Sequence, residues 1–188
     1  KPNGSSCTIS LTPARQAPLA ALRRLQILVL HDNPLGLAPS VEAMPHLLHL
    51  DLSKTGIDTL PTGVLTRPEL DLVLLNDNQI RELPAALFAL APEKSENFVL
   101  SDNPLSRATM ERVKAYYQRQ GTRFEIDAPA ADVRDARRLY PSLSVEELNQ
   151  LIYALPGTLE AGQIELARLA AELETLVNLQ TAGRADSR

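Results

Sequence analysis

The sequence predicts an α/β protein: a solenoid of stacked repeats with parallel strands on its concave face, followed by a small all-helical tail. Three observations support this prediction. A leucine-containing motif recurs four times at spacings of 22, 23 and 25 residues, apolar residues adopt helical spacing after residue 126, and leucine dominates a composition that is 44% apolar and lacks Trp. Repeats of this length bury their apolar sides by stacking on their neighbours.

The repeated motif has the form L-x-x-L-x-L-x-x-N-x-L. Its four copies occupy residues 25–35, 47–57, 70–80 and 95–105, with Asn33, Thr55, Asn78 and Asn103 at the Asn position. All four copies fit the leucine-rich-repeat template, and the one weak position is the opening residue Ser95 of the last copy. The chain therefore resembles leucine-rich-repeat proteins over about half its length. Leucines that flank a single residue point the same way on a strand, and Asn binds backbone groups where the strand turns.

Each copy of the motif predicts one short strand, and the segments between copies predict compact return segments. The predicted strands are residues 28–30, 50–52, 73–75 and 98–100. Leu60-Pro61 and Leu83-Pro84 keep the return segments from forming long helices, because proline fixes an extended or turn backbone. Residues 8–19 predict a degenerate first repeat, so the solenoid domain is expected to cover residues 1–126.

A C-terminal cap for the solenoid is predicted at residues 106–126, because the last repeat otherwise exposes an apolar end. Ser106 is a suitable N-cap for a helix that Gly121 ends. The inward residues of this helix are predicted to be Met110, Val113 and Tyr117. Phe124 and Ile126 then alternate as a final edge strand would.

Residues 127–188 predict a helical hairpin or linker segment. A helix is expected at 131–139, and the Ser-x-x-Glu capping box at 144–147 opens a second one. The apolar face of this second helix is predicted to hold Leu148, Leu151, Ile152 and Leu155. After a turn at 156–157, a longer helix from Thr158 carries one apolar stripe, and the apolar faces of these helices are expected to pack against each other or against the solenoid. That stripe consists of Leu166, Leu169, Leu173, Leu176 and Val177.

The variable strand positions stand in rows on the predicted concave face and are the candidate partner-binding residues. They are Ile27, Val29, His31, His49, Asp51, Ser53, Leu72, Leu74, Asn76, Asn97, Val99 and Ser101. Five of the twelve are aliphatic, and an apolar patch rimmed by polar residues is typical of an interface. The alternative is that the helical tail, or a neighbouring domain of a longer protein, covers these residues.

Charge and composition argue against several classes of partner. Residues 1–126 hold 13 Lys+Arg and 13 Asp+Glu, while residues 127–188 hold 6 and 10, so neither part has the basic excess that nucleic acid or an anionic membrane would require. No apolar run approaches the ~20 residues that span a bilayer. The single cysteine, Cys7, cannot form an internal disulfide, and an opening Lys1 instead of Met suggests a piece of a longer protein.

No metal site, cofactor, small-molecule substrate or catalytic centre is expected. His31 lies two residues before its Asn and His49 six residues before Thr55, so the two are offset by four residues, on the order of 13 Å along a strand. Zinc requires ligands at about 2 Å from one point. His46 and His49 are therefore interpreted as surface residues. Cys7 has no neighbouring base in sequence, and we interpret it as a structural thiol.

A second resemblance concerns the end of the repeats and the tail. Residues 102–106, Asp-Asn-Pro-Leu-Ser, lead into a capping helix as in the leucine-rich-repeat regions of bacterial effector proteins. Residues 139–144 and 152–157 resemble segments of large Pseudomonas-type toxins that carry NEL-type (novel ubiquitin ligase) domains. The resemblance implies a virulence protein secreted into the host cytoplasm, whose repeats select a host substrate and restrain its own catalytic domain.

In that family the catalytic cysteine lies in a C-x-D motif, whereas Cys7 is followed by Thr8 and Ile9. The catalytic domain is therefore not present, and the sequence predicts a protein–protein interaction module that is not itself an enzyme. Two alternatives stay open. The tail could be a cysteine-independent helical ubiquitin ligase, although some sixty residues offer little core, or the chain could be a structural spacer within a larger toxin.

Overall fold

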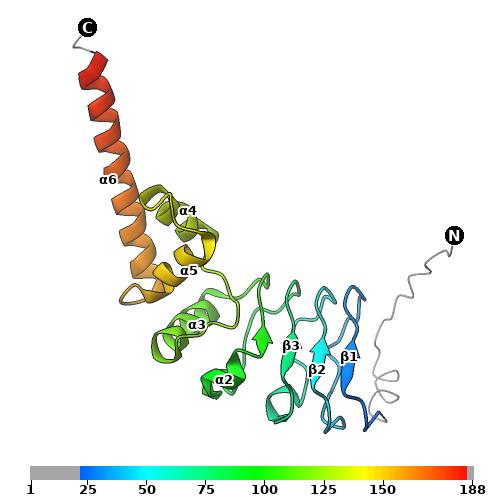
Figure 1. Cartoon of the computed structure of the whole chain (residues 1–188). Coiled ribbons are helices and arrows are strands. Elements are labelled where there is room, and N and C mark those ends of the chain that lie inside the picture. The colour runs from blue at the N-terminus through cyan, green and yellow to red at the C-terminus, as the bar shows by residue number, and fades with distance from the viewer. Residues whose placement is uncertain (1–21, 186–188) are drawn as a thin grey trace, which may run out of the picture. The chain divides into compact units, whose positions relative to one another are not determined.

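Four short strands form one parallel sheet whose spatial order follows the chain. They are β1 (Ile27–Val29), β2 (His49–Asp51), β3 (Leu72–Leu74) and β4 (Phe98–Val99). The sheet and the helices that follow it confirm the predicted α/β class with parallel strands (Figure 1). Each strand ends one residue earlier than predicted, because the chain turns into a left-handed conformation shortly after the last paired residue, and the first three strands also begin one residue earlier.

The computed structural model describes residues 22–185, so Cys7 and the predicted repeat at 8–19 lie outside the described residues. The chain divides into two compact units. The first contains the sheet and comprises residues up to Tyr116 together with Gln120–Ile126. The second comprises Tyr117–Arg119 and the residues from Asp127 onward, and each unit is described by itself below.

The core of the first unit is a row of residues at equivalent positions in the repeats. The register aligns Leu28 with Leu50, Leu50 with Val73, and Val73 with Phe98. Of the eight residues predicted to share this core, seven are buried: Leu28, Leu50, Leu52, Val73, Leu75, Phe98 and Leu100. The prediction is wrong for Leu30, which is half-buried, because it follows β1, and β1 pairs only with β2 among the described strands.

The Asn position of the motif satisfies backbone groups in two successive repeats. The Asn78 Nδ2 donates to the carbonyls of Leu52 (2.9 Å) and Leu75 (3.0 Å), and its Oδ1 accepts from the Thr55 N–H at 3.0 Å. Asn103 repeats the arrangement one repeat later, donating to Leu75 and accepting from Ile80. Buried backbone groups need such partners, which explains why the motif favours an amide here.

A residue with positive φ precedes each Asn or Thr of the motif. These residues are Asp32, Lys54, Asp77 and Asp102, with φ between 55° and 58°. The N–H groups of the first three donate to the next repeat, as from Lys54 to the Asn76 carbonyl at 3.1 Å. Asp tolerates the left-handed region better than most residues, so the Asp-Asn pair in three of the four motifs is the sequence signal for this turn.

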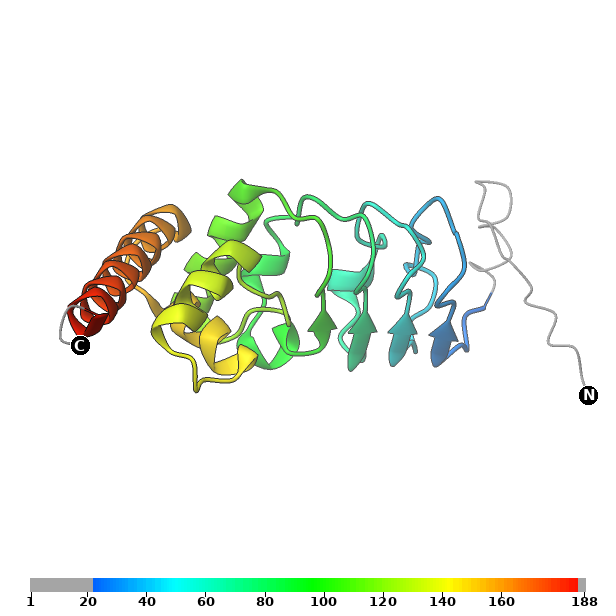
Figure 2. The same cartoon turned by 90° about the horizontal axis from the view of Figure 1, so that it is seen from above.

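The return segments contain two 3-10 turns, η1 (Val64–Thr66) and η2 (Leu87–Ala89), and one short helix, α2 (Pro92–Ser95). Figure 2 shows the strands in a row along one side of the unit and the return segments along the other. Gly63 precedes η1 with φ of 86°, and a Cβ there would lie 2.6 Å from the Glu42 Cγ. Close stacking of successive return segments therefore requires glycine at this position.

The predicted cap helix is α3 (Arg107–Gln120), which Ser106 caps by accepting from the Thr109 N–H. Tyr117 was predicted to be the inward aromatic residue, but the structure has Tyr116 in that role. Tyr116 is fully buried, and its hydroxyl donates to the Leu90 carbonyl at 2.8 Å. Helical spacing predicts one apolar side of a helix, and two adjacent tyrosines leave the choice between them to tertiary packing.

The predicted final edge strand does not form, although Phe124 and Ile126 are buried. Phe124 and Glu125 both have φ of 56°, which is incompatible with a strand. The Phe124 carbonyl nevertheless accepts the Leu100 N–H at 2.9 Å. In the preceding repeats Leu52 and Leu75 donate in the same way to Leu74 and Val99, so the cap supplies the next carbonyl without a strand.

The second unit has the three helices that were predicted at 131–139, after the capping box at 144–147, and from residue 158 onward. They are α4 (Ala130–Leu139), α5 (Val145–Ala154) and α6 (Leu159–Ala185), and α4 packs against both of the others. The capping box at Ser144 and Glu147 is present as predicted. Asn149 is also buried, accepting from the Ala128 N–H and donating to Asp127, a contact that helical spacing could not predict.

The apolar stripe of α6 is only half buried. Leu166 is 3% exposed, but Leu173, Leu176 and Val177 are 38%, 58% and 50% exposed. The prediction of one buried stripe is therefore wrong for the second half of the helix, because α6 has 27 residues and its partners α4 and α5 have 10 each (Figure 1). Among the described residues, no helix is both long and apolar enough to cross a membrane.

Candidate functional site

The exposed side of the sheet brings the twelve predicted residues into rows, and we call it the sheet face. Residues alternate across a strand, so the neighbours of each buried strand residue point outward. The register places Ile27, His49 and Leu72 side by side, with Asn97 preceding β4. A second row runs through Val29, Asp51, Leu74 and Val99. The remaining four, His31, Ser53, Asn76 and Ser101, follow the strands.

Aliphatic side chains on the sheet face are accessible to a partner. Ile27 is 59% exposed and Val29 is 47% exposed, while Leu72, Leu74 and Val99 are half-buried. Strands hold these side chains in fixed positions, because each backbone is hydrogen-bonded to its neighbours. A partner that covered them would remove apolar area from water at little cost in ordering the protein.

Several polar side chains of the sheet face are held in place by hydrogen bonds. Asp51 accepts from the N–H and the hydroxyl of Ser53, at 3.0 and 2.7 Å. Asn97 donates to the Leu70 carbonyl at 3.1 Å, and Asn76 donates to Asp77 at 2.7 Å. These bonds orient the polar side chains before any partner arrives, which lowers the entropy lost on binding.

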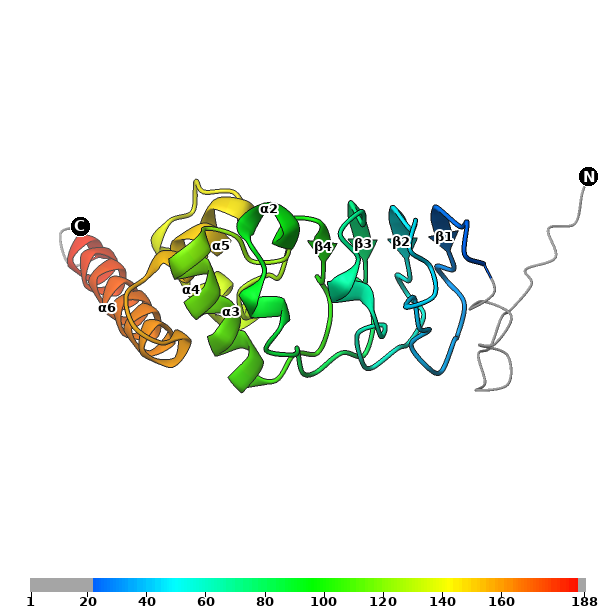
Figure 3. The ribbon, with the colours of Figure 1, turned by 90° about the horizontal axis from the view of Figure 1, so that it is seen from below.

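The β2 strand divides the aliphatic residues into two groups. Ile27 and Val29 lie on β1, while Leu72 and Leu74 lie on β3 and Val99 lies on the neighbouring β4. Figure 3 shows β2 between β1 and β3. Between them β2 carries His49 and Asp51. Since neighbouring strands are about 4.8 Å apart, the two aliphatic groups are separated by roughly 10 Å. A complementary surface therefore needs two apolar patches with a polar group between them.

The strand register pairs His49 with Ile27, so His31 and His49 are offset by four residues, as predicted. His31 contacts Asp32 at 3.1 Å, and His46 contacts Glu69 at 3.7 Å, both on the surface. Among residues 22–185, no group of three or more His, Cys, Asp or Glu side chains could hold a metal ion.

The turn residues beside the sheet face were not among the predicted site residues. Asp32, Asp77 and Asp102 are exposed at the ends of their strands, and Lys54 occupies the same position after β2. They add charge next to the four sheet-face residues that follow the strands, His31, Ser53, Asn76 and Ser101. The recurrence of Asp directly before the motif Asn could have identified them.

Comparison of the sequence with models of known protein families and with curated proteins finds no match in either.

Proposed function

We propose that the first unit is a leucine-rich-repeat solenoid and that its sheet face, the concave side of that solenoid, binds another protein. The carrying observation is the set of aliphatic side chains that rigid strands present on this face, above all Ile27, Val29, Leu72 and Leu74. Aliphatic side chains in the centre of an interface contribute most of its binding energy when their neighbours exclude water.

The repeated geometry of the first unit supports a solenoid. Equivalent residues pair from one strand to the next, and the amides of Asn78 and Asn103 each bridge two repeats. The Phe124 carbonyl then replaces the next strand for Leu100. This arrangement of local, repeated contacts with a distinct cap is typical of repeat proteins.

A protein partner fits the sheet face better than nucleic acid or a small molecule does. The equal numbers of basic and acidic residues in 1–126 give no excess positive charge for phosphates. Small ligands are bound in cavities that enclose most of their surface, whereas a sheet offers a broad platform. The partner proposed is a host protein or the parent protein's own catalytic domain, in keeping with the resemblance to secreted bacterial effectors.

The test compares two double variants in capture from host lysate followed by binding to the purified captured protein. Leu72→Glu/Leu74→Glu places charge on the sheet face, while Leu176→Glu/Leu179→Glu places equal charge on exposed leucines of α6. We expect the first variant to lose binding and the second to retain it, because an unpaired charge in an interface is strongly unfavourable. Retained binding by a folded Leu72→Glu/Leu74→Glu variant would refute the assignment.

We also propose that the chain has no ligase activity of its own. An autoubiquitination assay with the isolated chain should give no product. If the protein formed product after Cys7→Ser substitution, the cysteine-independent helical ligase would become the better interpretation.

A further inference from the structure

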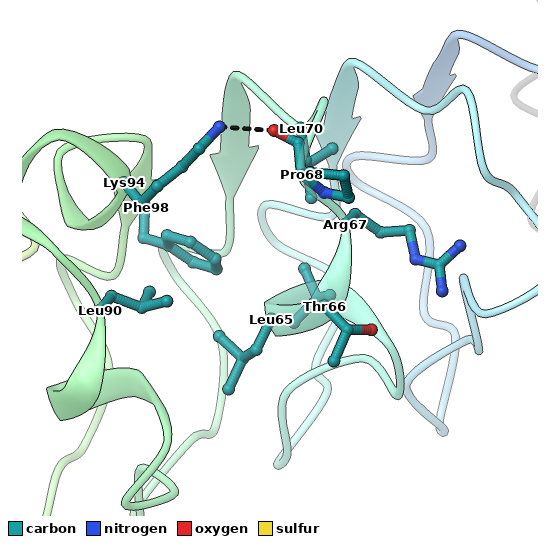
Figure 4. Close-up of a pocket in the computed structure, with 9 residues that line it drawn as sticks. Leu65, Thr66, Arg67, Pro68, Leu70, Leu90, Lys94 and Phe98 are labelled. Carbon is teal, nitrogen blue, oxygen red and sulfur yellow. Dashed lines mark hydrogen bonds between the residues drawn. The ribbon is translucent and has the colours of Figure 1, made fainter.

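A small cavity opens between two successive return segments, apart from the sheet face. Its volume is about 200 Å³, and none of its lining residues belongs to the sheet face. Figure 4 shows Leu65 and Pro68 on one side, Leu90 and Phe98 on the other, and Lys94 at the rim. The Arg67 guanidinium points away from this space (Figure 4).

The sequence explains why the cavity lies here. The motif spacing rises from 23 to 25 residues in the last repeat, and this longer return segment contains α2, which the preceding return segment lacks. Ser95 also stands where the two preceding motifs have the buried leucines Leu47 and Leu70. Its hydroxyl turns back to the Pro92 carbonyl at 2.8 Å. Because the two return segments differ in length and Ser95 replaces a leucine, their side chains do not fill the space between them.

We infer that this cavity receives one leucine-sized apolar side chain of a protein partner, with a carboxylate beside it paired to Lys94. The volume favours a single side chain, because pockets for drug-sized molecules are typically 300 to 1,000 Å³. The lining is mostly aliphatic and aromatic, which matches an apolar occupant. This inference adds a second contact surface and does not depend on binding at the sheet face.

Lys94 supplies the charge complementarity. Its Nζ donates to the Pro68 carbonyl at 2.6 Å, which fixes the ammonium at the rim and uses one of its three donors. Among the residues that the structure describes, Lys94 forms no ion pair. The other two donors are available to a carboxylate, so the preferred occupant is an apolar side chain adjacent to an acidic group.

N-acetyl-leucine is a direct probe, because it joins a leucine side chain to one carboxylate. Titrated into the isotope-labelled full chain, it should shift the backbone amide resonances of Leu65, Leu90 and Phe98 with a Kd on the order of a millimolar. N-acetyl-leucinamide, which lacks the charge, should shift the same resonances about two- to fivefold more weakly. N-acetyl-alanine should leave them unchanged. Shifts confined to other residues would overturn the assignment.

Two variants separate the charge from the cavity. Lys94→Met keeps most of the aliphatic stem and should weaken N-acetyl-leucine about two- to fivefold without changing the affinity for the amide, whereas Arg81→Met, at an exposed position, should change neither. Leu65→Phe fills the cavity and should abolish binding of both probes. Equal weakening of acid and amide by Lys94→Met, or undiminished binding by folded Leu65→Phe, would reject the proposal.

Discussion

The repeat unit and the helical unit bury similar residues but specify their contacts in different ways. In the repeat unit, the partner of a buried residue occupies the same position in the next repeat, as Leu50 and Val73 do. In the helical unit, Leu148 and Leu166 lie on apolar helix faces, yet their spacing does not say which helix each face meets. The sequence period therefore predicts which residues pack together in the first unit. In the second unit it predicts only which side of each helix is buried.

Buried polar groups show the same contrast. Asn78 stands at a repeated motif position, and its hydrogen bonds follow from that position. Asn149 is equally buried and holds residues 127–128, but no recurring pattern marks it. A repeat makes its polar contacts recognisable in the sequence, whereas a small helical unit uses polar contacts found only once.

The largest effects are expected at buried leucines, and in the repeat unit at the centre of its core. Leu52 is fully buried, and its neighbours in the stack lie on both sides, so Leu52→Ala should lower the free energy of unfolding by about 2 to 5 kcal/mol. Denaturant melts would measure the loss. A change below about 1 kcal/mol would mean that the neighbouring side chains move into the space left by the leucine, so that the repeat core is not tightly packed.

The Asn position should follow in magnitude. Asn78→Ala removes the acceptor of the Thr55 N–H and the donors to two carbonyls, so we expect a loss of about 1 to 3 kcal/mol in the free energy of unfolding. Asn78→Thr should lose less, because the Thr55 hydroxyl itself donates to the carbonyl of Leu52 at 2.7 Å. If Asn78→Ala is as stable as wild type, the amide does not stabilise the stack, and if the two variants are equally stable, a hydroxyl does not replace the amide.

Sequence reasoning predicted the parallel sheet, the buried row and the capping box because each depends on local or repeated signals. It missed the choice of Tyr116 over Tyr117, which depends on the surface the helix meets. It also missed the cavity beside Leu90, because an unfilled space arises from two return segments together and not from one motif. The rows of the sheet face followed from the repeat, but the polar division by β2 emerged only from the register.

Helix capping provides an intermediate effect in the helical unit. Ser144→Ala should cost about 1 kcal/mol of unfolding free energy, since the Ser144 hydroxyl accepts from the Glu147 N–H. Hydrogen bonds from the Ser144 backbone and hydroxyl lower the pKa of Glu147. A lowered pKa stabilises the fold above the unfolded value and loses that contribution as the pH falls below about 4.3. Ser144→Ala keeps the backbone bond to the Glu147 carboxylate and removes only the one from the hydroxyl, so the advantage of wild type should shrink in acid without vanishing, measured by melts at several pH values.

The left-handed turns allow a small gain in the repeat unit. Lys54 has φ of 55° where the other repeats have Asp, so Lys54→Gly should raise the free energy of unfolding by about 0.5 to 1 kcal/mol. Asp77→Gly is the matched control and should gain less, because Asp tolerates this conformation better. Equal gains, measured by thermal melts, would mean that the side chain at this position does not affect the turn.

The smallest effect is expected on the exposed half of α6, where the same residue type can be compared along one stripe. Leu176 is 58% exposed, so Leu176→Ala should change the free energy of unfolding by less than about 0.5 kcal/mol. Leu166 is 3% exposed, and Leu166→Ala should cost about 2 to 5 kcal/mol. Thermal melts at two protein concentrations would test both. A large, concentration-dependent loss at Leu176 would show that a second copy covers this stripe in solution, and the two halves of α6 would then differ in partner and not in burial.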